Sequence, residues 1–107
     1  MRLFQGDMSH FGGALGQTKG LFEKFGGKRI LDTPISEGAI VGAAVGASML
    51  GMRPLTDIMF TNFSTLAMDQ IINQAVKARF MSGGKVSLPV VIKMQSGAGR
   101  GKVSYHS

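Results

Sequence analysis

The chain has 107 residues, enough for one domain, and 44% of them are hydrophobic, enough for a packed core. It has no cysteine and only two histidines, which excludes a disulfide framework and a thiolate metal site, and we expect no metal site of its own. The net charge is +6, but the basic residues are scattered and no aromatic residue lies in an RNA-binding motif, so we expect no nucleic-acid partner.

The first third of the chain predicts two short strands joined by a helix. Residues 2–4 and 29–32 have the character of strands, and residues 18–25 form a short helix with one apolar patch. A Gly-Gly pair ends this helix. Pro34 disfavours helix at the residue before it and suits the first turn of a new helix.

The helix predicted over residues 36–50 is built almost wholly of small, uncharged residues. Gly38, Gly42 and Gly46 recur at a spacing of four and so lie on one stripe of its surface. Because each glycine costs about 1 kcal/mol in a helix, three on one stripe indicate that another backbone approaches closely. We expect a subunit interface there. The apolar run is shorter than the roughly 20 residues that span a bilayer, so we expect no membrane partner.

The remaining chain continues the alternation of strands and helices. Residues 55–60 and 88–94 predict strands, residues 62–81 predict the longest helix, and residues 96–107 form a Gly-rich loop. The long helix carries two adjacent apolar stripes, formed by Phe63, Ala67, Ile71 and Ala75 and by Met68, Ile72, Val76 and Phe80. The order of elements predicts an α/β fold, a parallel sheet flanked by helices.

Three side chains that are candidates for catalysis or ligand binding follow the ends of predicted strands. Glu37, Phe63 and His106 each follow a strand, and the carboxyl ends of parallel strands share the edge at which ligands bind. From the residues alone, Glu37 is either a first-turn acid favoured by the helix dipole or a buried acid with a catalytic role. Phe63 is likewise either a core aromatic or a ligand contact. For His106, one residue from the end of the sequence, disorder is a strong alternative to a functional role.

Several motifs in this order closely resemble the beta subunit of thiamine-diphosphate-dependent 2-oxoacid dehydrogenases, the pyruvate, branched-chain and acetoin dehydrogenase group. The likeness runs over essentially the whole chain. Its motifs are Asp32-Thr33-Pro34-Ile35-Ser36-Glu37 with the small-residue helix, Arg53-Pro54, Met68-Asp69-Gln70-Ile71-Ile72-Asn73-Gln74, Met81-Ser82-Gly83-Gly84 and Gly97-Ala98-Gly99-Arg100-Gly101.

The resemblance implies roles for the residues at this edge. Glu37 matches the family's catalytic glutamate, which hydrogen-bonds the aminopyrimidine ring of thiamine diphosphate and thereby promotes loss of the thiazolium proton. Phe63 matches an aromatic residue that stacks on that ring, and Ile35 and Met59 match apolar residues near the cofactor. His106 matches a histidine near the substrate and the incoming lipoyl group.

The resemblance also implies partners. The family is an alpha2-beta2 heterotetramer, so we expect an alpha subunit that shares the cofactor and holds the magnesium, a second beta subunit, and a lipoyl acyltransferase core. The expected location is the cytoplasm of a prokaryote or the mitochondrial matrix. Residues 1–107 would form a partial pyrimidine-binding domain, truncated at both ends and inactive by itself.

Two alternatives remain open beside a pyruvate or branched-chain 2-oxoacid dehydrogenase. The chain is also consistent with the beta subunit of an acetoin dehydrogenase, or with a non-catalytic dimerisation or interaction fragment of the same fold. One departure concerns Gly6, which stands where the family carries an acid that links the two active sites. The resemblance implies that the residues that choose among substrates lie largely in the partner chain and in the part of the family protein outside this sequence.

Overall fold

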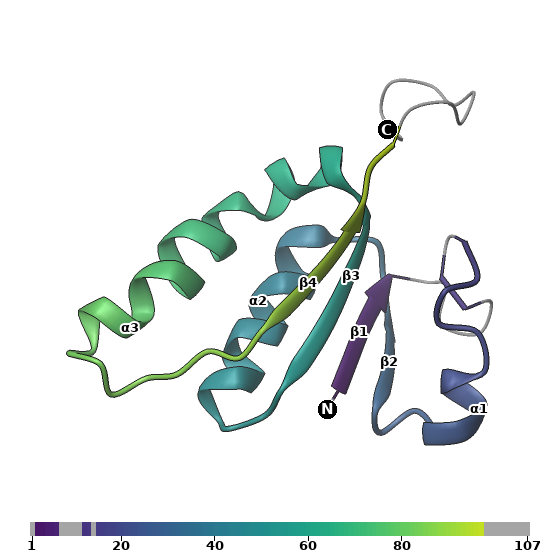
Figure 1. Ribbon diagram of the computed structural model, residues 1–107, viewed down its shortest axis with the longest axis horizontal. Helices are drawn as coiled ribbons and strands as arrows, with labels where there is room; N and C mark the ends of the chain where they lie inside the picture. Colours follow the sequence, from purple (N-terminus) through teal and green to yellow (C-terminus); the bar gives the residue numbers. More distant parts are fainter. Residues whose placement is uncertain (1, 7–11, 14, 98–107) are drawn as a thin grey trace.

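The computed structural model describes the backbone of residues 2–6 and the whole of residues 12, 13 and 15–97. In this part of the chain, four parallel strands form one sheet in the order β2-β1-β3-β4 (Figure 1). The strands are β1 (Arg2–Gly6), β2 (Ile30–Thr33), β3 (Pro54–Phe60) and β4 (Val91–Gln95). The α/β fold with a parallel sheet that the sequence predicts is therefore confirmed.

The helices cover the sheet as right-handed crossovers require. The helices are α1 (Leu21–Phe25), α2 (Glu37–Met49), and a helical segment made of η1 (Thr61–Ala67), η2 (Gln70–Val76) and α3 (Lys77–Met81). Across the sheet, the chain steps toward one edge from β1 to β2, and toward the opposite edge from β2 to β3 and then to β4. Right-handed connections therefore place α1 on one side, and α2 with the helical segment on the other, as Figure 1 shows.

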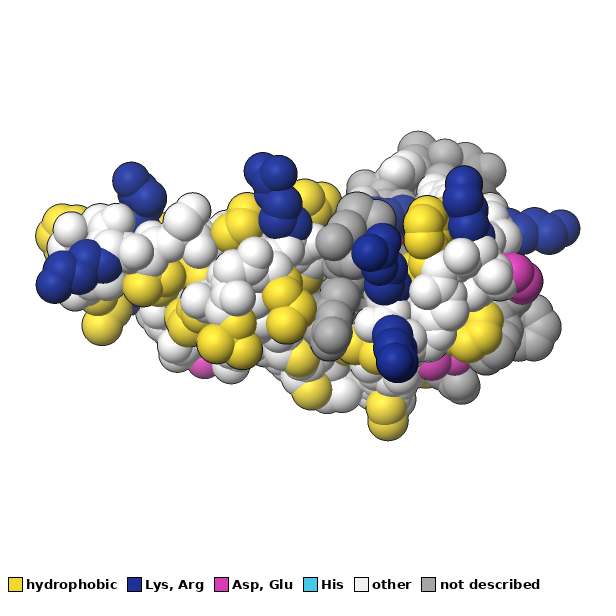
Figure 2. Space-filling view, turned by 90° about the horizontal axis from the view of Figure 1, so that it is seen from below, with side chains coloured by type: hydrophobic (Ala, Val, Ile, Leu, Met, Phe, Trp, Pro, Cys, Tyr) yellow, Lys and Arg dark blue, Asp and Glu magenta, His cyan; other side chains and the backbone are white. Residues whose placement is uncertain are grey.

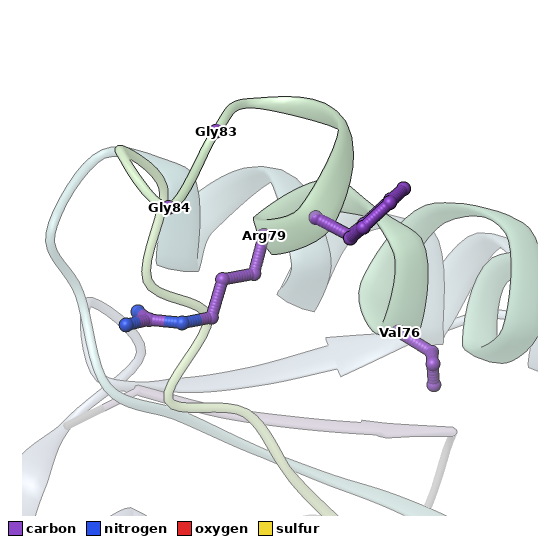
Figure 3. A pocket seen from close by; sticks show the side chains of 5 residues that line it. Val76, Arg79, Gly83 and Gly84 are labelled. Atoms are coloured by element: carbon purple, nitrogen blue, oxygen red, sulfur yellow. The ribbon is translucent and has the colours of Figure 1, made fainter.

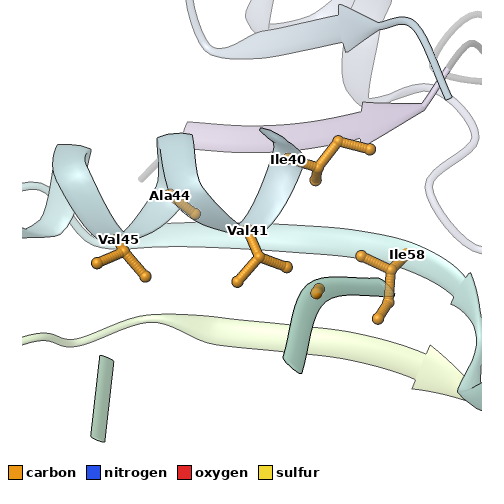
Figure 4. Packing of buried hydrophobic residues seen from close by; sticks show 6 residues of the cluster. Ile40, Val41, Ala44, Val45 and Ile58 are labelled. Carbon is orange, nitrogen blue, oxygen red and sulfur yellow. The ribbon is translucent and has the colours of Figure 1, made fainter. Parts of the chain in front are cut away.

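The hydrophobic core lies between α2 and the centre of the sheet. Ile40, Val41, Ala44 and Val45 of α2 form one cluster with Ile58 of β3 (Figure 4). Val41 and Ala44 are fully buried, as is Ala67 at the end of η1. The small side chains of α2 thus allow this helix to contact both the sheet and the helical segment closely.

Two predicted boundaries are wrong for reasons visible in the backbone. The first helix begins at Leu21 rather than at residue 18, because Gly20 has φ 81° and cannot belong to a right-handed helix. The last strand begins at Val91 rather than at residue 88, because Pro89 has no N–H to donate to β3. Val91 and Met94 are also exposed, as expected for an edge strand rather than a buried one.

The helix predicted over residues 62–81 is present as one helical stretch, but only its end is regular α-helix. Its first part is a 3-10 helix and residues 70–76 form a π-helix. Thr65 donates its hydroxyl to the carbonyl of Asn62 at 3.0 Å, a local bond that competes with α-helical pairing. One predicted stripe packs on the core through Ala67, Ile71 and Ala75. The other stripe is exposed, with Phe80 89% accessible.

The surface carries the excess of positive charge in dispersed form. Figure 2 shows one face of the molecule, on which Lys and Arg side chains stand apart from one another between hydrophobic ones. The absence of a nucleic-acid partner stays a prediction. Among the described residues, no helix combines the length and the apolar character needed to cross a bilayer.

Candidate active site

The carboxyl edge of the sheet has a switch point between β1 and β3. The connection after β1 leads to β2 on one side, and the connection after β3 leads to β4 on the other. Ligands in open α/β sheets bind in the crevice at such a point. The first turn of α2 and the start of η1 both lie at this edge, since each follows the end of a strand.

Glu37 is the first residue of α2 and is buried, with 7% of its surface exposed. Ser36 before it has extended backbone, which directs the chain from β2 into the helix. Within the described part of the chain, the Glu37 carboxylate has no hydrogen bond or ion pair to another residue. Its oxygens are not among the fully enclosed polar atoms that lack a partner, which in the described residues are Thr56 Oγ1 and Gln95 Nε2, so they reach the surface, where they are accessible to a ligand. Glu37 is thus both a buried residue and a first-turn acid of α2, and its catalytic role stays a prediction.

The glycine stripe of α2 brings the helical segment close to Glu37. A Cβ atom on Gly38 would lie 3.2 Å from the carbonyl oxygen of Leu66, and one on Gly42 would lie 3.2 Å from Oε1 of Gln70. The close approach at these two glycines is therefore made by another helical segment of the same chain. The sequence pattern predicts a close approach but does not identify its partner. Gly46 is exposed, and nothing lies within 4 Å of its Cβ position. A subunit interface along this stripe stays a prediction.

Two phenylalanines lie at the start of the helical segment. The rings of Phe60 and Phe63 meet edge to face, with centroids 6.2 Å apart and planes at 85°. Phe60 is buried, whereas Phe63 is half-buried and keeps part of its surface accessible. Phe60 thus packs against Phe63, whose ring stays partly accessible. The sequence analysis did not predict this role of Phe60, because residue 60 resembles an ordinary core position.

Ile35 and Met59, the predicted apolar contacts, lie at the same edge on different elements. Ile35 precedes α2 and is 66% exposed, and Met59 near the end of β3 is half-buried. Next to Glu37, the first two turns of α2 border an apolar pocket of about 290 Å³, lined by Thr33, Pro34, Ser36, Ala39, Ile40 and Ala43. The edge therefore offers apolar surface beside the buried acid.

A second buried carboxylate was not predicted. Asp57 of β3 is 1% exposed and forms an ion pair with Lys93 of β4, with Nζ 2.7 Å from Oδ2. The two residues are direct partners in the sheet. A signal was present in the sequence, since each residue is the single charge in an otherwise apolar or uncharged strand.

A separate pocket lies at the opposite end of the helical segment. It is lined by Val76, Arg79, Phe80, Gly83 and Gly84, and Figure 3 shows it beyond the last turn of α3. It contains no acid and no buried polar side chain. This pocket does not resemble a catalytic site. His106, the remaining predicted catalytic residue, lies outside the described residues.

The strand order and the carboxyl edge together define an α/β domain with a parallel sheet and a buried acidic residue at the start of α2. Residues 1–107 match the family described as transketolase, pyrimidine binding domain, and the chain belongs to this family. It is 52% identical over 102 residues to the beta subunit of acetoin:2,6-dichlorophenolindophenol oxidoreductase of Cupriavidus necator. It is 46% identical over 101 residues to the corresponding subunit of Bacillus subtilis and to the human mitochondrial pyruvate dehydrogenase E1 component subunit beta.

These matches cover nearly all of this chain but a minor part of each relative. They include 95% of the chain and 30% of the Cupriavidus protein, and 94% of the chain and 28% of the human protein. The chain therefore spans less than a third of the length of the relatives it matches. The resemblance to the beta subunits of the 2-oxoacid and acetoin dehydrogenase group is confirmed over that span.

Proposed function

We propose that this chain forms the pyrimidine-binding part of a beta subunit in a thiamine-diphosphate-dependent dehydrogenase. The enzyme would decarboxylate a 2-oxoacid, pyruvate or a branched-chain one, oxidatively and transfer the acyl group to lipoamide, or would act on acetoin. The observation that carries the proposal is Glu37, a buried acidic residue at the start of α2 whose carboxylate has no partner among the described residues. The relatives' names support both substrate classes, and the chain's own residues do not choose between them.

The residues at the carboxyl edge fit one end of this cofactor. Glu37 would hydrogen-bond a nitrogen of the aminopyrimidine ring, which gives its carboxylate a partner. Phe63, backed by Phe60 at 6.2 Å, would offer its accessible face to that ring, and Ile35 and Met59 would add apolar contact. When bound, thiamine diphosphate supplies the carbanion chemistry, and the residues of this chain orient its ring and hold a proton at Glu37.

The other end of the cofactor needs a second chain in this proposal. Among the described residues, no group of three His, Cys, Asp or Glu side chains could hold a metal ion. We assign the magnesium and the diphosphate to an alpha subunit, because the relatives are named as beta subunits. A second beta subunit, through Gly46 and its neighbours on α2, and a lipoyl acyltransferase core would complete the assembly. His106 would serve the substrate and the lipoyl group.

The same proposal includes the location and the extent of the domain. The relatives include bacterial proteins and mitochondrial ones, which supports the cytoplasm of a prokaryote or the mitochondrial matrix. Residues 1–107 would be a partial domain, inactive without the alpha subunit, because half of the cofactor site lies elsewhere.

The test uses the whole gene product that carries this sequence, co-expressed with its alpha subunit. Two reactions would be measured with thiamine diphosphate and magnesium. They are the decarboxylation of pyruvate and of branched-chain 2-oxoacids, and the cleavage of acetoin. We expect Glu37→Gln to lower kcat by about 100-fold or more, the usual scale for loss of an acid–base group. Glu23→Gln, on the exposed surface of α1, is the matched control. Unchanged activity in Glu37→Gln would contradict the proposal.

A second candidate, a non-catalytic interaction module, has one observation in its favour. The outer stripe of the helical segment exposes Ile72, Val76 and Phe80, with Phe80 89% accessible. Thermal unfolding with thiamine diphosphate and magnesium, with and without the alpha subunit, separates the two candidates. A raised unfolding temperature that requires the alpha subunit supports the enzyme, and no shift in either case supports the module.

A further inference from the structure

The buried carboxylate of Asp57 accepts hydrogen bonds from its own strand, β3, and from the neighbouring strand, β4. Its Oδ1 accepts a hydrogen bond from the backbone N–H of Met59 at 2.9 Å, and its Oδ2 accepts one from Lys93 Nζ at 2.7 Å. Asp57 is 1% exposed, and the Lys93 side chain is 26% exposed. Charge-assisted bonds of this length fix the carboxylate plane, so Lys93 orients the oxygen that faces Met59.

Met59 has a left-handed backbone conformation, with φ 63°. It is the one non-glycine residue with positive φ in the described part of the chain. An unbranched side chain adopts this conformation rarely, because its Cβ crowds the following carbonyl oxygen. The bond from Met59 to Asp57 is an Asx turn, the local arrangement in which an acid two residues earlier supports a turn of the chain.

The left-handed residue coincides with a bulge in β3. Asp57 pairs with Lys93 and Phe60 pairs with Gln95, so Ile58 and Met59 together oppose Met94 alone. One extra residue in a strand reverses which face the following side chains take.

The bulge changes the face of the sheet on which Phe60 lies. Lys93 and Gln95 are two residues apart and so lie on one face, and their partners Asp57 and Phe60 therefore share that face. In a regular strand, Phe60 would instead share the face of Ile58, which packs in the main core. Phe60 is buried, but it is not part of that core and meets Phe63 instead.

We propose that Asp57, oriented by Lys93, is a positioning residue that keeps Met59 left-handed and thereby presents the Phe60–Phe63 pair at the carboxyl edge. The consequence for the cofactor rests on the proposed function, because Phe63 is the ring that would face the aminopyrimidine. The consequence for the backbone does not, since the Asx turn, the positive φ and the bulge are properties of the chain itself.

The test is a mutant cycle in the whole gene product assembled with its alpha subunit. Asp57→Ala is made in three backgrounds: the natural sequence, Met59→Gly and Met59→Ala. Glycine adopts the left-handed conformation without support, whereas alanine shortens the side chain and keeps the backbone penalty. The Kd of magnesium thiamine diphosphate is measured by calorimetry, and unfolding is measured in the absence of cofactor.

We expect Asp57→Ala to weaken cofactor binding about tenfold in the natural and Met59→Ala backgrounds, and less than about threefold in Met59→Gly. Asp57→Asn keeps an acceptor oxygen for Met59 but loses the charge-assisted bond with which Lys93 orients it, so we expect a weakening of cofactor binding that is smaller than in Asp57→Ala. Three results would overturn the proposal. Asp57→Ala could lower cofactor affinity equally in all three backgrounds, or leave it unchanged in the natural one. Alternatively, Asp57→Asn could lower it as much as Asp57→Ala does.

Two further outcomes separate this inference from the proposed function. If the natural protein does not bind the cofactor, the proposed function fails, and unfolding without cofactor decides the inference. The inference is supported if the loss of unfolding free energy caused by Asp57→Ala is smaller in Met59→Gly than in the natural sequence, but not smaller in Met59→Ala. It is refuted if the effects on the free energy of unfolding are additive. If Asp57→Ala does not fold, recovery of a folded protein with Met59→Gly but not with Met59→Ala supports it, and recovery with neither refutes it.

Discussion

Glu37 and Asp57 are both buried acidic residues at the carboxyl half of the sheet, yet Asp57 faces a lysine 2.7 Å away while Glu37 faces no described cation or donor. The fold therefore contains one acid that is fully enclosed and paired within the chain, and one buried residue whose carboxylate has no partner among the described residues. An acid of the second kind contributes little to folding and is retained where a ligand uses it.

Replacing Glu37 should lower activity and leave stability nearly unchanged. Glu37→Gln removes a charge that has no partner among the described residues and loses at most about 1 kcal/mol of helix-dipole interaction at the first residue of α2. We therefore expect the free energy of unfolding without cofactor to change by less than about 1 kcal/mol. Calorimetric unfolding of the natural protein and the variant measures this. A decrease of about 2 kcal/mol or more would show that Glu37 contributes to folding rather than to a ligand site.

Removing the cation beside Asp57 should instead lower stability. Lys93→Met leaves the Asp57 carboxylate buried and unpaired, and we expect the free energy of unfolding to fall by about 3 kcal/mol. The matched control is Lys77→Met, which removes an exposed lysine whose Nζ lies 2.7 Å from Oδ1 of Asn73. That control should change stability by less than about 0.5 kcal/mol. Similar losses in both variants would show that Asp57 gains little from Lys93.

The three glycines of α2 should respond differently to alanine. Helix propensity alone favours alanine over glycine by about 1 kcal/mol. At Gly46 the Cβ position is open, so Gly46→Ala should gain this amount. At Gly42 the Gln70 side chain can move aside, and the change should be near zero. At Gly38 the Cβ meets the backbone carbonyl of Leu66 at 3.2 Å, so Gly38→Ala should destabilise.

The same series tests the subunit interface predicted from the glycine stripe. If Gly46 packs against another subunit in the assembled enzyme, Gly46→Ala should stabilise the isolated chain and weaken assembly, as measured by analytical ultracentrifugation. Assembly that is unchanged in Gly46→Ala, together with the order of stabilities above, would show that the stripe serves contacts within the chain alone.

The sequence predicts the alternating order of elements and the position of Glu37, because both depend on local patterns. Hydrophobic periodicity and glycine or proline at the boundaries identify each strand and helix separately. A strand followed by a small-residue helix is sufficient to place an acid at the carboxyl edge. The burial of Glu37 does not follow from its neighbours in sequence, since Ser36 and Ala39 are exposed.

The features that the sequence does not predict arise from pairing between distant segments. Asp57 and Lys93 are 36 residues apart, and only the register of β3 with β4 makes them partners. The bulge at Met59 depends on the same register, so neither its positive φ nor the position of Phe60 follows from the residues near it. The contact of Gly38 with Leu66 likewise requires two helices to be placed in space.

Ile35 offers a prediction in which binding and stability separate. Its side chain is 66% exposed, so Ile35→Ala should change the free energy of unfolding by less than about 0.5 kcal/mol. If the cofactor ring covers this side chain, its loss should raise the Kd of magnesium thiamine diphosphate by about tenfold, because a buried aliphatic side chain contributes about 1.5 kcal/mol. The matched comparison is Ile58→Ala, whose side chain is 1% exposed in the core. That variant should lose about 3 kcal/mol of stability. An unchanged Kd in Ile35→Ala would remove Ile35 from the cofactor site and leave the role of Glu37 to be judged by its own variant.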